Sequence, residues 1–183
     1  MTRVDLLDAG RAPITAQPLY ADGDPGPIVA ALAHVPELLE VALPFIGGAL
    51  SPGAVDLRTK EIVILRASAL LECRYCTLTH TVVARDAGLT RDEVRALRGD
   101  AARAVFTAPR ERALLDWVDV VALGPGAPSD ATAAALREHF AEHEIVELTV
   151  TVGATLMLNR FATALGLPTS PDTLDRLSEE GLV

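Results

Sequence analysis

Apolar residues recur at intervals of three and four along most of this chain, which is the spacing of one face of an α-helix. Between residues 28 and 50 this pattern predicts one or two helices, broken near Pro36. Between residues 56 and 71 it predicts another, with Asp56 as a suitable N-cap. The same pattern, together with capping and stop signals, predicts five further helices, at residues 74–87, from Thr90 onward, 109–123, 129–140 and 142–165.

The segment 142–165 decides the fold class. Its run of Thr and Val at residues 149–152 would also suit a strand, but about 24 residues is far longer than strands normally reach. Residues 145–158 are apolar on most faces, so this helix should be central. We therefore expect an all-α fold.

Length and composition agree with one helical domain. The chain has 183 residues, and half of them are hydrophobic while only 4% are aromatic, so Ala, Leu, Val and Ile must fill the core. Residues 1–27 contain four prolines and are expected to form an irregular N-terminal arm. Residues 28–168 are the expected helical domain, and residues 169–183 are the expected C-terminal tail.

The charge and the apolar runs bear on partners and location. The formal net charge is -9, which disfavours a phosphate-binding surface, so no nucleic-acid partner is expected. The longest apolar run, Leu148–Leu158, is shorter than the roughly 20 residues of a membrane-spanning helix. The N-terminus turns acidic at once, which argues against a secretory signal. We expect a cytoplasmic protein that is not inserted in a membrane.

The two cysteines belong to a Cys-x-x-Cys-x-x-x-His arrangement formed by Cys73, Cys76 and His80. In a helix these three side chains lie on nearly one face. A thiolate near a helix start is favoured by the free backbone N–H groups, and an imidazole nearby can accept or return its proton. The spacing also allows one sulfur to reach the other and close a disulfide. The arrangement therefore suits dithiol redox chemistry.

Two other interpretations of these residues stay open. The two thiols and His80, completed by His139 or His143, could bind zinc, although a second cysteine pair is missing. Alternatively, both cysteines are small buried apolar residues without a chemical role.

Residues 61–80 (EIVILRASALLECRYCTLTH) resemble the core motif of the carboxymuconolactone decarboxylase and alkylhydroperoxidase D-like (AhpD-like) superfamily. In that family a glutamate precedes the first cysteine by twelve residues, which is the interval from Glu61 to Cys73. The resemblance covers about residues 28 to 165, including Glu-Ile-Val-Glu-Leu-Thr at 144–149 and Asn-Arg-Phe at 159–161.

The resemblance implies a fold, an activity and a set of site residues. Family members are all-α homo-oligomers, and those that reduce peroxides use no metal or organic cofactor. By carry-over, Glu61 is the proton-relay base, His80 is its histidine partner, and Cys73 with Cys76 forms the redox pair. The chain is then expected to be a thiol peroxidase with peroxiredoxin activity toward an organic hydroperoxide. The partners are that hydroperoxide and an external dithiol or lipoylated electron donor.

The expected cycle begins with attack by the Cys76 thiolate on the peroxide O–O bond. The resulting sulfenic acid condenses with Cys73 to a disulfide, which the external dithiol reduces. The assignment of the first attack to Cys76 follows from its being nearer to His80 in sequence.

Several features leave alternatives beside this hypothesis. Alkylhydroperoxidase D has a second histidine where this chain has Tyr75, so Tyr75 is expected to line the substrate pocket instead. Ser68 lies two turns after Glu61 on the same face and is a further pocket candidate, although packing in a tight helix contact explains it better. Glu61 itself could merely pair with Lys60 or Arg66.

The activity also has alternatives. One is a cofactor-free lactone decarboxylase of the same superfamily that uses Glu61 and His80 as acid and base, although the true decarboxylases lack the cysteine pair. The other is a non-enzymatic oligomer that binds zinc or senses oxidants.

Overall fold

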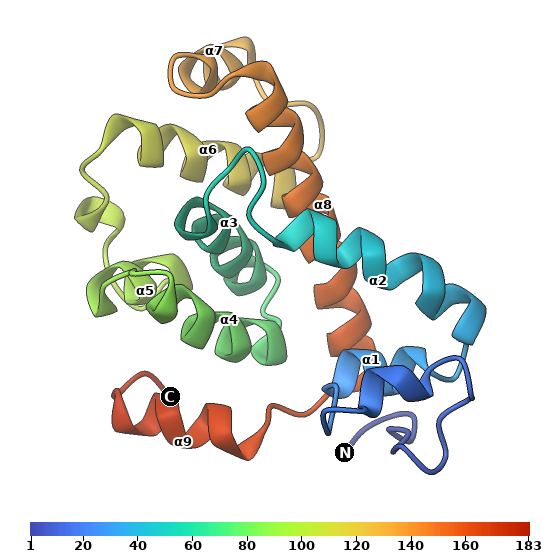
Figure 1. The fold of residues 1–183 in the computed structure, drawn as a ribbon. Helices are drawn as coiled ribbons and strands as arrows, with labels where there is room; N and C mark the ends of the chain where they lie inside the picture. The colour runs from blue at the N-terminus through green and yellow to red at the C-terminus, as the bar shows by residue number, and fades with distance from the viewer.

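The computed structural model describes residues 1–183, and its chain folds into nine α-helices and two short 3-10 helices without a strand (Figure 1). The all-α prediction is thereby confirmed. In chain order the elements are η1 Gln17–Tyr20, α1 Pro27–Leu32, α2 Pro36–Leu50, α3 Leu57–Leu70, α4 Arg74–Asp86, α5 Arg91–Arg98, η2 Arg103–Val105, α6 Pro109–Leu123, α7 Asp130–Arg137, α8 Glu142–Leu165 and α9 Pro171–Glu179.

The helix ends follow the local signals in the sequence. The break predicted near Pro36 separates α1 from α2. The Asp56 carboxylate accepts a hydrogen bond from the Thr59 N–H at 2.9 Å and so caps α3. Thr90 and Glu93 form the reciprocal capping box of α5. The left-handed conformation of Gly166 ends α8.

Helix α3 is the centre of the bundle, with α4, α5, α6 and α8 packed around it (Figure 1). The run Ile62–Leu65 is buried on every side, which explains why apolar residues occupy consecutive positions there. The main core joins these residues to buried side chains of α4, α5, α6 and α8. The site residues of α3 and α4 therefore stand on rigid, buried elements.

Helix α8 has the length and apolar composition of a membrane-spanning helix. It packs against α2, α3, α4 and α6, and Leu148, Val152 and Ala162 are buried in those contacts. These contacts make α8 a core helix along one face, although α3 rather than α8 is the centre of the bundle.

The terminal segments pack onto the bundle. In the N-terminal segment Leu7 and Tyr20 are buried against α1 and α2, and the Tyr20 hydroxyl donates to the Leu7 carbonyl at 2.8 Å. At the other end α9 lies along α4, and Leu177 and Leu182 are buried in the main core. Residues 169–183 therefore contribute a core helix.

Candidate functional site

The turn between α3 and α4 places Cys73 at the start of a helix. Glu72, the residue before it, has a φ of 53°, a left-handed conformation that is uncommon for a residue with a side chain. This turn makes Cys73 the N-cap of α4, where its Sγ accepts a hydrogen bond from the Cys76 N–H at 3.4 Å. Free N–H groups at a helix start favour a thiolate over a thiol.

The two cysteine sulfurs form a buried, hydrogen-bonded pair. The Sγ atoms of Cys76 and Cys73 are hydrogen-bonded across 2.8 Å, and the exposed fractions of the two residues are 5% and 1%. This hydrogen bond, followed by the one from the Cys76 backbone N–H, lowers the pKa of Cys73 to about 6. The same hydrogen bond to Cys73, followed by burial, raises the pKa of Cys76. At neutral pH the pair therefore carries one negative charge, on Cys73, and one proton, on Cys76.

An acid–base pair lies next to the cysteines. His80 Nδ1 lies 2.9 Å from Glu61 Oε2, and only 2% of Glu61 is exposed. When the neutral imidazole donates from Nδ1 to this carboxylate, its Nε2 is left as a proton acceptor. His80 is one turn after Cys76 on α4, so this acceptor and the thiol belong to the same helix face.

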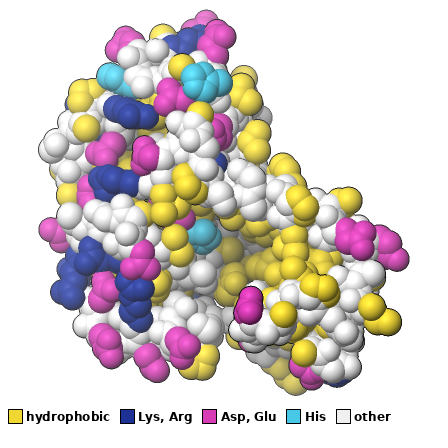
Figure 2. All heavy atoms as spheres, in the orientation of Figure 1, with side chains coloured by type: hydrophobic (Ala, Val, Ile, Leu, Met, Phe, Trp, Pro, Cys, Tyr) yellow, Lys and Arg dark blue, Asp and Glu magenta, His cyan; other side chains and the backbone are white.

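A cavity of about 220 Å³ brings the reactive groups into contact with a ligand space. Its polar lining comes from α3, α4 and α8 and includes Cys76 and His80, but not Cys73. Its apolar lining comes mostly from α1 and α2, through Ile28, Val29, Leu43, Ile46 and Leu50, together with Ile64 and Leu158. Figure 2 shows a hollow with hydrophobic walls between the body of the bundle and the projecting α1 and α2. A ligand there would meet an apolar wall on one side and Cys76 on the other.

The structure brings the predicted site residues together. Cys73 contacts Cys76, and Glu61 contacts His80, while Ser68 and Tyr75 line the cavity. Burial raises the pKa of Tyr75 to about 12, so its phenol stays protonated at neutral pH. The chemical roles assigned to these six residues remain predictions.

The alternative partners proposed for Glu61 are engaged elsewhere. Lys60 Nζ lies 2.7 Å from Glu147, and Arg66 pairs with Asp119 at 2.7 Å. Glu61 is therefore not held as the surface partner of a neighbouring cation.

The zinc interpretation lacks a ligand set. No three His, Cys, Asp or Glu side chains converge closely enough to hold one metal ion. His139 and His143 thus do not complete a site with the cysteine pair.

Asn159 is the cavity residue that the sequence pattern did not identify. Its Oδ1 accepts a hydrogen bond from the Ser68 hydroxyl at 3.1 Å, which joins α8 to α3. In the sequence this residue stood out only as the first of the Asn-Arg-Phe triplet at 159–161. The available signal was a polar side chain inside an apolar helix, which does not reveal a neighbouring cavity.

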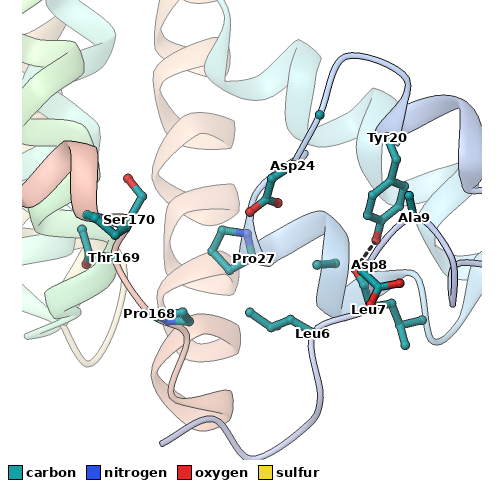
Figure 3. A pocket seen from close by; sticks show the side chains of 13 residues that line it. Leu6, Leu7, Asp8, Ala9, Tyr20, Asp24, Pro27, Pro168, Thr169 and Ser170 are labelled. Atoms are coloured by element: carbon teal, nitrogen blue, oxygen red, sulfur yellow. Dashed lines mark hydrogen bonds between the residues drawn. The ribbon is translucent and has the colours of Figure 1, made fainter.

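A larger cavity of about 670 Å³ lies apart from this chemistry (Figure 3). The N-terminal segment, the start of α1 and the α8–α9 connection enclose it, with Leu6, Asp24 and Pro168 in its wall. None of its lining residues borders the cavity at Cys76. Although it is larger, this cavity holds neither the cysteines nor His80 and is not the candidate site.

Solved structures of other proteins share this fold. An uncharacterized peroxidase-related protein from Ralstonia eutropha, described as an alkylhydroperoxidase AhpD core, superimposes with a TM-score of 0.81 over 94% of each chain at 19% identity. A protein of unknown function from Agrobacterium tumefaciens, proposed to be the antioxidant defence protein AhpD, has a TM-score of 0.70 and 28% identity. That match covers 76% of this chain and 95% of the other. The fold is thus of the AhpD-like class.

Within that fold, part of the sequence matches a known family. Residues 36–120, which contain the cysteines, His80 and Glu61, match the carboxymuconolactone decarboxylase family. A curated relative, the uncharacterized protein YdfG of Bacillus subtilis (strain 168), is 27% identical over 62% of this chain and 77% of its own length. Residues 36–120 thus match the carboxymuconolactone decarboxylase family, and the fold around them is similar to that of AhpD-like proteins.

Proposed function

We propose that this protein is a thiol peroxidase that reduces an organic hydroperoxide through a Cys73–Cys76 disulfide cycle. The observation that carries the proposal is the sulfur pair separated by 2.8 Å, with Cys76 on the wall of the cavity that His80 also lines. The apolar walls from α1 and α2 suit the organic part of the substrate.

Cys76 is the attacking residue in this proposal because it lines the cavity, whereas Cys73 does not. In the resting pair, however, the negative charge is on Cys73, because its pKa is lowered while that of Cys76 is raised. Transfer of the proton from Cys76 to Cys73 along the existing hydrogen bond moves the negative charge to Cys76 and leaves both sulfurs in place. Access decides which sulfur attacks, because a nucleophile must reach its substrate.

The electron balance of the cycle is that of two thiols and one hydroperoxide. The Cys76 thiolate attacks the terminal oxygen, so that an S–O bond forms, the O–O bond breaks and an alkoxide leaves. The alkoxide takes the proton of Cys73 by way of His80. The Cys73 thiolate then attacks the sulfenic sulfur, and the departing hydroxide takes a proton from solvent through His80 and Glu61. The products are a disulfide, an alcohol and water.

An external dithiol, free or carried as a lipoyl group, reduces the disulfide in this proposal. Exchange begins with a thiolate that attacks one of the two sulfurs. Cys76 is the sulfur that lines the cavity, so the reductant attacks there. A reducing cytoplasm is the compartment that keeps such a pair available as thiols.

The first test is chemical oxidation of the reduced, metal-free protein with cumene hydroperoxide. Trypsin cleaves after Arg74, so a Cys73–Cys76 disulfide joins the peptides 67–74 and 75–85 in the mass spectrum. We expect the joined peptides to form in proportion to peroxide added and to separate with dithiothreitol. Cys76→Ser should abolish both the joined species and turnover. Thiols that stay reduced would contradict the proposal, and oxidation without turnover would indicate a sensor.

A cofactor-free acid–base reaction is the second candidate, and the Glu61–His80 contact at 2.9 Å favours it. A lactone decarboxylation would use this pair and would not need the sulfurs. Release of CO₂ from a muconolactone that persists in Cys76→Ser would support it over the peroxidase.

We also propose that the chain forms a homo-oligomer. Val146, Val150 and Met157 make an exposed apolar stripe on α8, and Val41 and Phe45 are exposed on α2. Exposed apolar faces of this kind are typical of subunit contacts. Light scattering should give a multiple of 19.3 kDa, and Val150→Glu should lower it.

A further inference from the structure

The side chain of Asn159 has an unpaired hydrogen-bond donor. Only 1% of the residue is exposed, and its Oδ1 accepts from the Ser68 hydroxyl at 3.1 Å. Its Nδ2 has no partner. Buried donors are normally satisfied, so an amide that is fixed on one side and unpaired on the other is typical of a ligand contact.

The place of this donor connects it to the reactive sulfur. Asn159 is on α8, and it lines the cavity that Cys76 and His80 border from α4. The other buried donor without a partner, Trp117 Nε1, borders neither this cavity nor the one of about 670 Å³. Ser68 lines the same cavity and holds the Asn159 amide by its oxygen, which leaves the NH₂ group for a ligand.

We propose that Asn159 Nδ2 donates a hydrogen bond to the leaving oxygen of the hydroperoxide, a role that rests on the proposed peroxidase function. As the thiolate forms its S–O bond, the O–O bond breaks and negative charge develops on the oxygen that carries the organic group. A fixed donor at that oxygen stabilises the transition state more than the bound substrate. The apolar side chains from α1 and α2 then hold the organic group, and the O–O bond is directed toward Cys76.

The test uses the rate at which the reduced protein forms its disulfide, because no electron donor is then needed. In Asn159→Leu the rate with tert-butyl hydroperoxide should fall about tenfold to a hundredfold, as for the loss of an oxyanion donor. With peracetic acid the rate should change far less, because the leaving acetate is already a stable anion. The thiolate absorbance at 240 nm should titrate as in the unchanged protein.

A control on the same helix separates this role from packing. Thr151 is buried and donates to the Ala49 carbonyl at 2.9 Å, but it does not line the cavity. Thr151→Val should lower stability and leave both rates unchanged. Ser68→Ala, which releases the amide oxygen, should slow tert-butyl hydroperoxide less than Asn159→Leu does. If Asn159→Leu does not fold, Ser68→Ala replaces it in the comparison of the two oxidants.

The outcomes distinguish this proposal from the one on which it rests. Equal slowing with both oxidants, a shifted thiol titration, or an unchanged rate with tert-butyl hydroperoxide would each overturn the role of Asn159. If the unchanged protein forms no disulfide with either oxidant, the peroxidase proposal fails instead.

Discussion

Lys60 and Glu61 are neighbours on α3, and both carry a buried charged group, yet their surroundings differ. Lys60 is fully buried, and its Nζ donates to the Ala49 carbonyl at 2.9 Å and lies 2.7 Å from Glu147. Glu147 in turn accepts from the Ala54 N–H at 2.9 Å. Glu61 instead contacts His80, which borders the cavity.

The difference shows how one helix can carry both a structural and a chemical charge. The Lys60 cluster is closed, because its ionic and carbonyl groups bind one another and join α2, α3 and α8. The Glu61 pair is open on one side, where a proton can pass to a ligand. We expect the Lys60 cluster to determine the stability of the fold and the Glu61–His80 pair to determine the rate of disulfide formation.

The largest effect is expected from Lys60→Met. This change leaves the Glu147 carboxylate without its cation, and breaking a buried pair typically costs about 3 kcal/mol of unfolding free energy. We take the lower end of the range because 21% of the Glu147 side chain is exposed. Urea unfolding measures the loss. The rate of disulfide formation under folding conditions should stay within a factor of about two, and an unchanged unfolding midpoint would refute a structural role.

Glu61→Gln should show the opposite pattern. The amide can still contact His80 but cannot accept its proton, so disulfide formation with cumene hydroperoxide should slow by about a hundredfold. Stopped-flow measurement of thiol loss gives the rate, and urea unfolding gives the stability for comparison with Lys60→Met. A normal rate would remove Glu61 from the relay.

Gly53 lies next to the Lys60 cluster, so adding a side chain there tests the contact between Lys60 and Glu147. A Cβ at Gly53 would lie 2.7 Å from Glu147 Oε1, so Gly53→Ala must displace the carboxylate from Lys60. We expect a loss of about 1 to 2 kcal/mol in unfolding free energy. Gly47→Ala is the matched control because a Cβ there meets nothing within 4 Å. In helix α2 it should stabilise by about 0.5 to 1 kcal/mol. Equal effects at both positions would contradict the contact.

The smallest effect is expected from pH. Because hydrogen bonds from Cys76 lower the pKa of Cys73 to about 6, the thiolate is present above that pH and is lost below it. Disulfide formation should therefore rise about tenfold from pH 5 to pH 7 and then level off. Thiolate absorbance over the same range should follow the rate. A rise centred near pH 8.5 would indicate an ordinary thiol.

The helices and their ends were largely predictable because their signals are local. The predicted bounds of α6 and α8 agree with the structure, and so do the Asp56 cap and the Thr90 capping box. The contact between Glu61 and His80 joins two helices, and the family motif predicted it where helical periodicity alone left Lys60 and Arg66 as possible partners. For residues 169–183 the local pattern suggested only a tail, yet Leu177 and Leu182 are buried against the bundle.

The sequence by itself determined the all-α class, most of the helix ends and the six candidate site residues, because each depends on spacing along the chain or on a motif. Only the tertiary structure decided which buried charges are closed and which face a cavity. It also decided that Cys76 borders that cavity while Cys73 does not, and that Asn159 joins it from α8. The physical reason is that burial, cavities and unpaired donors arise where separate helices meet, and local periodicity contains no information about which surfaces those are.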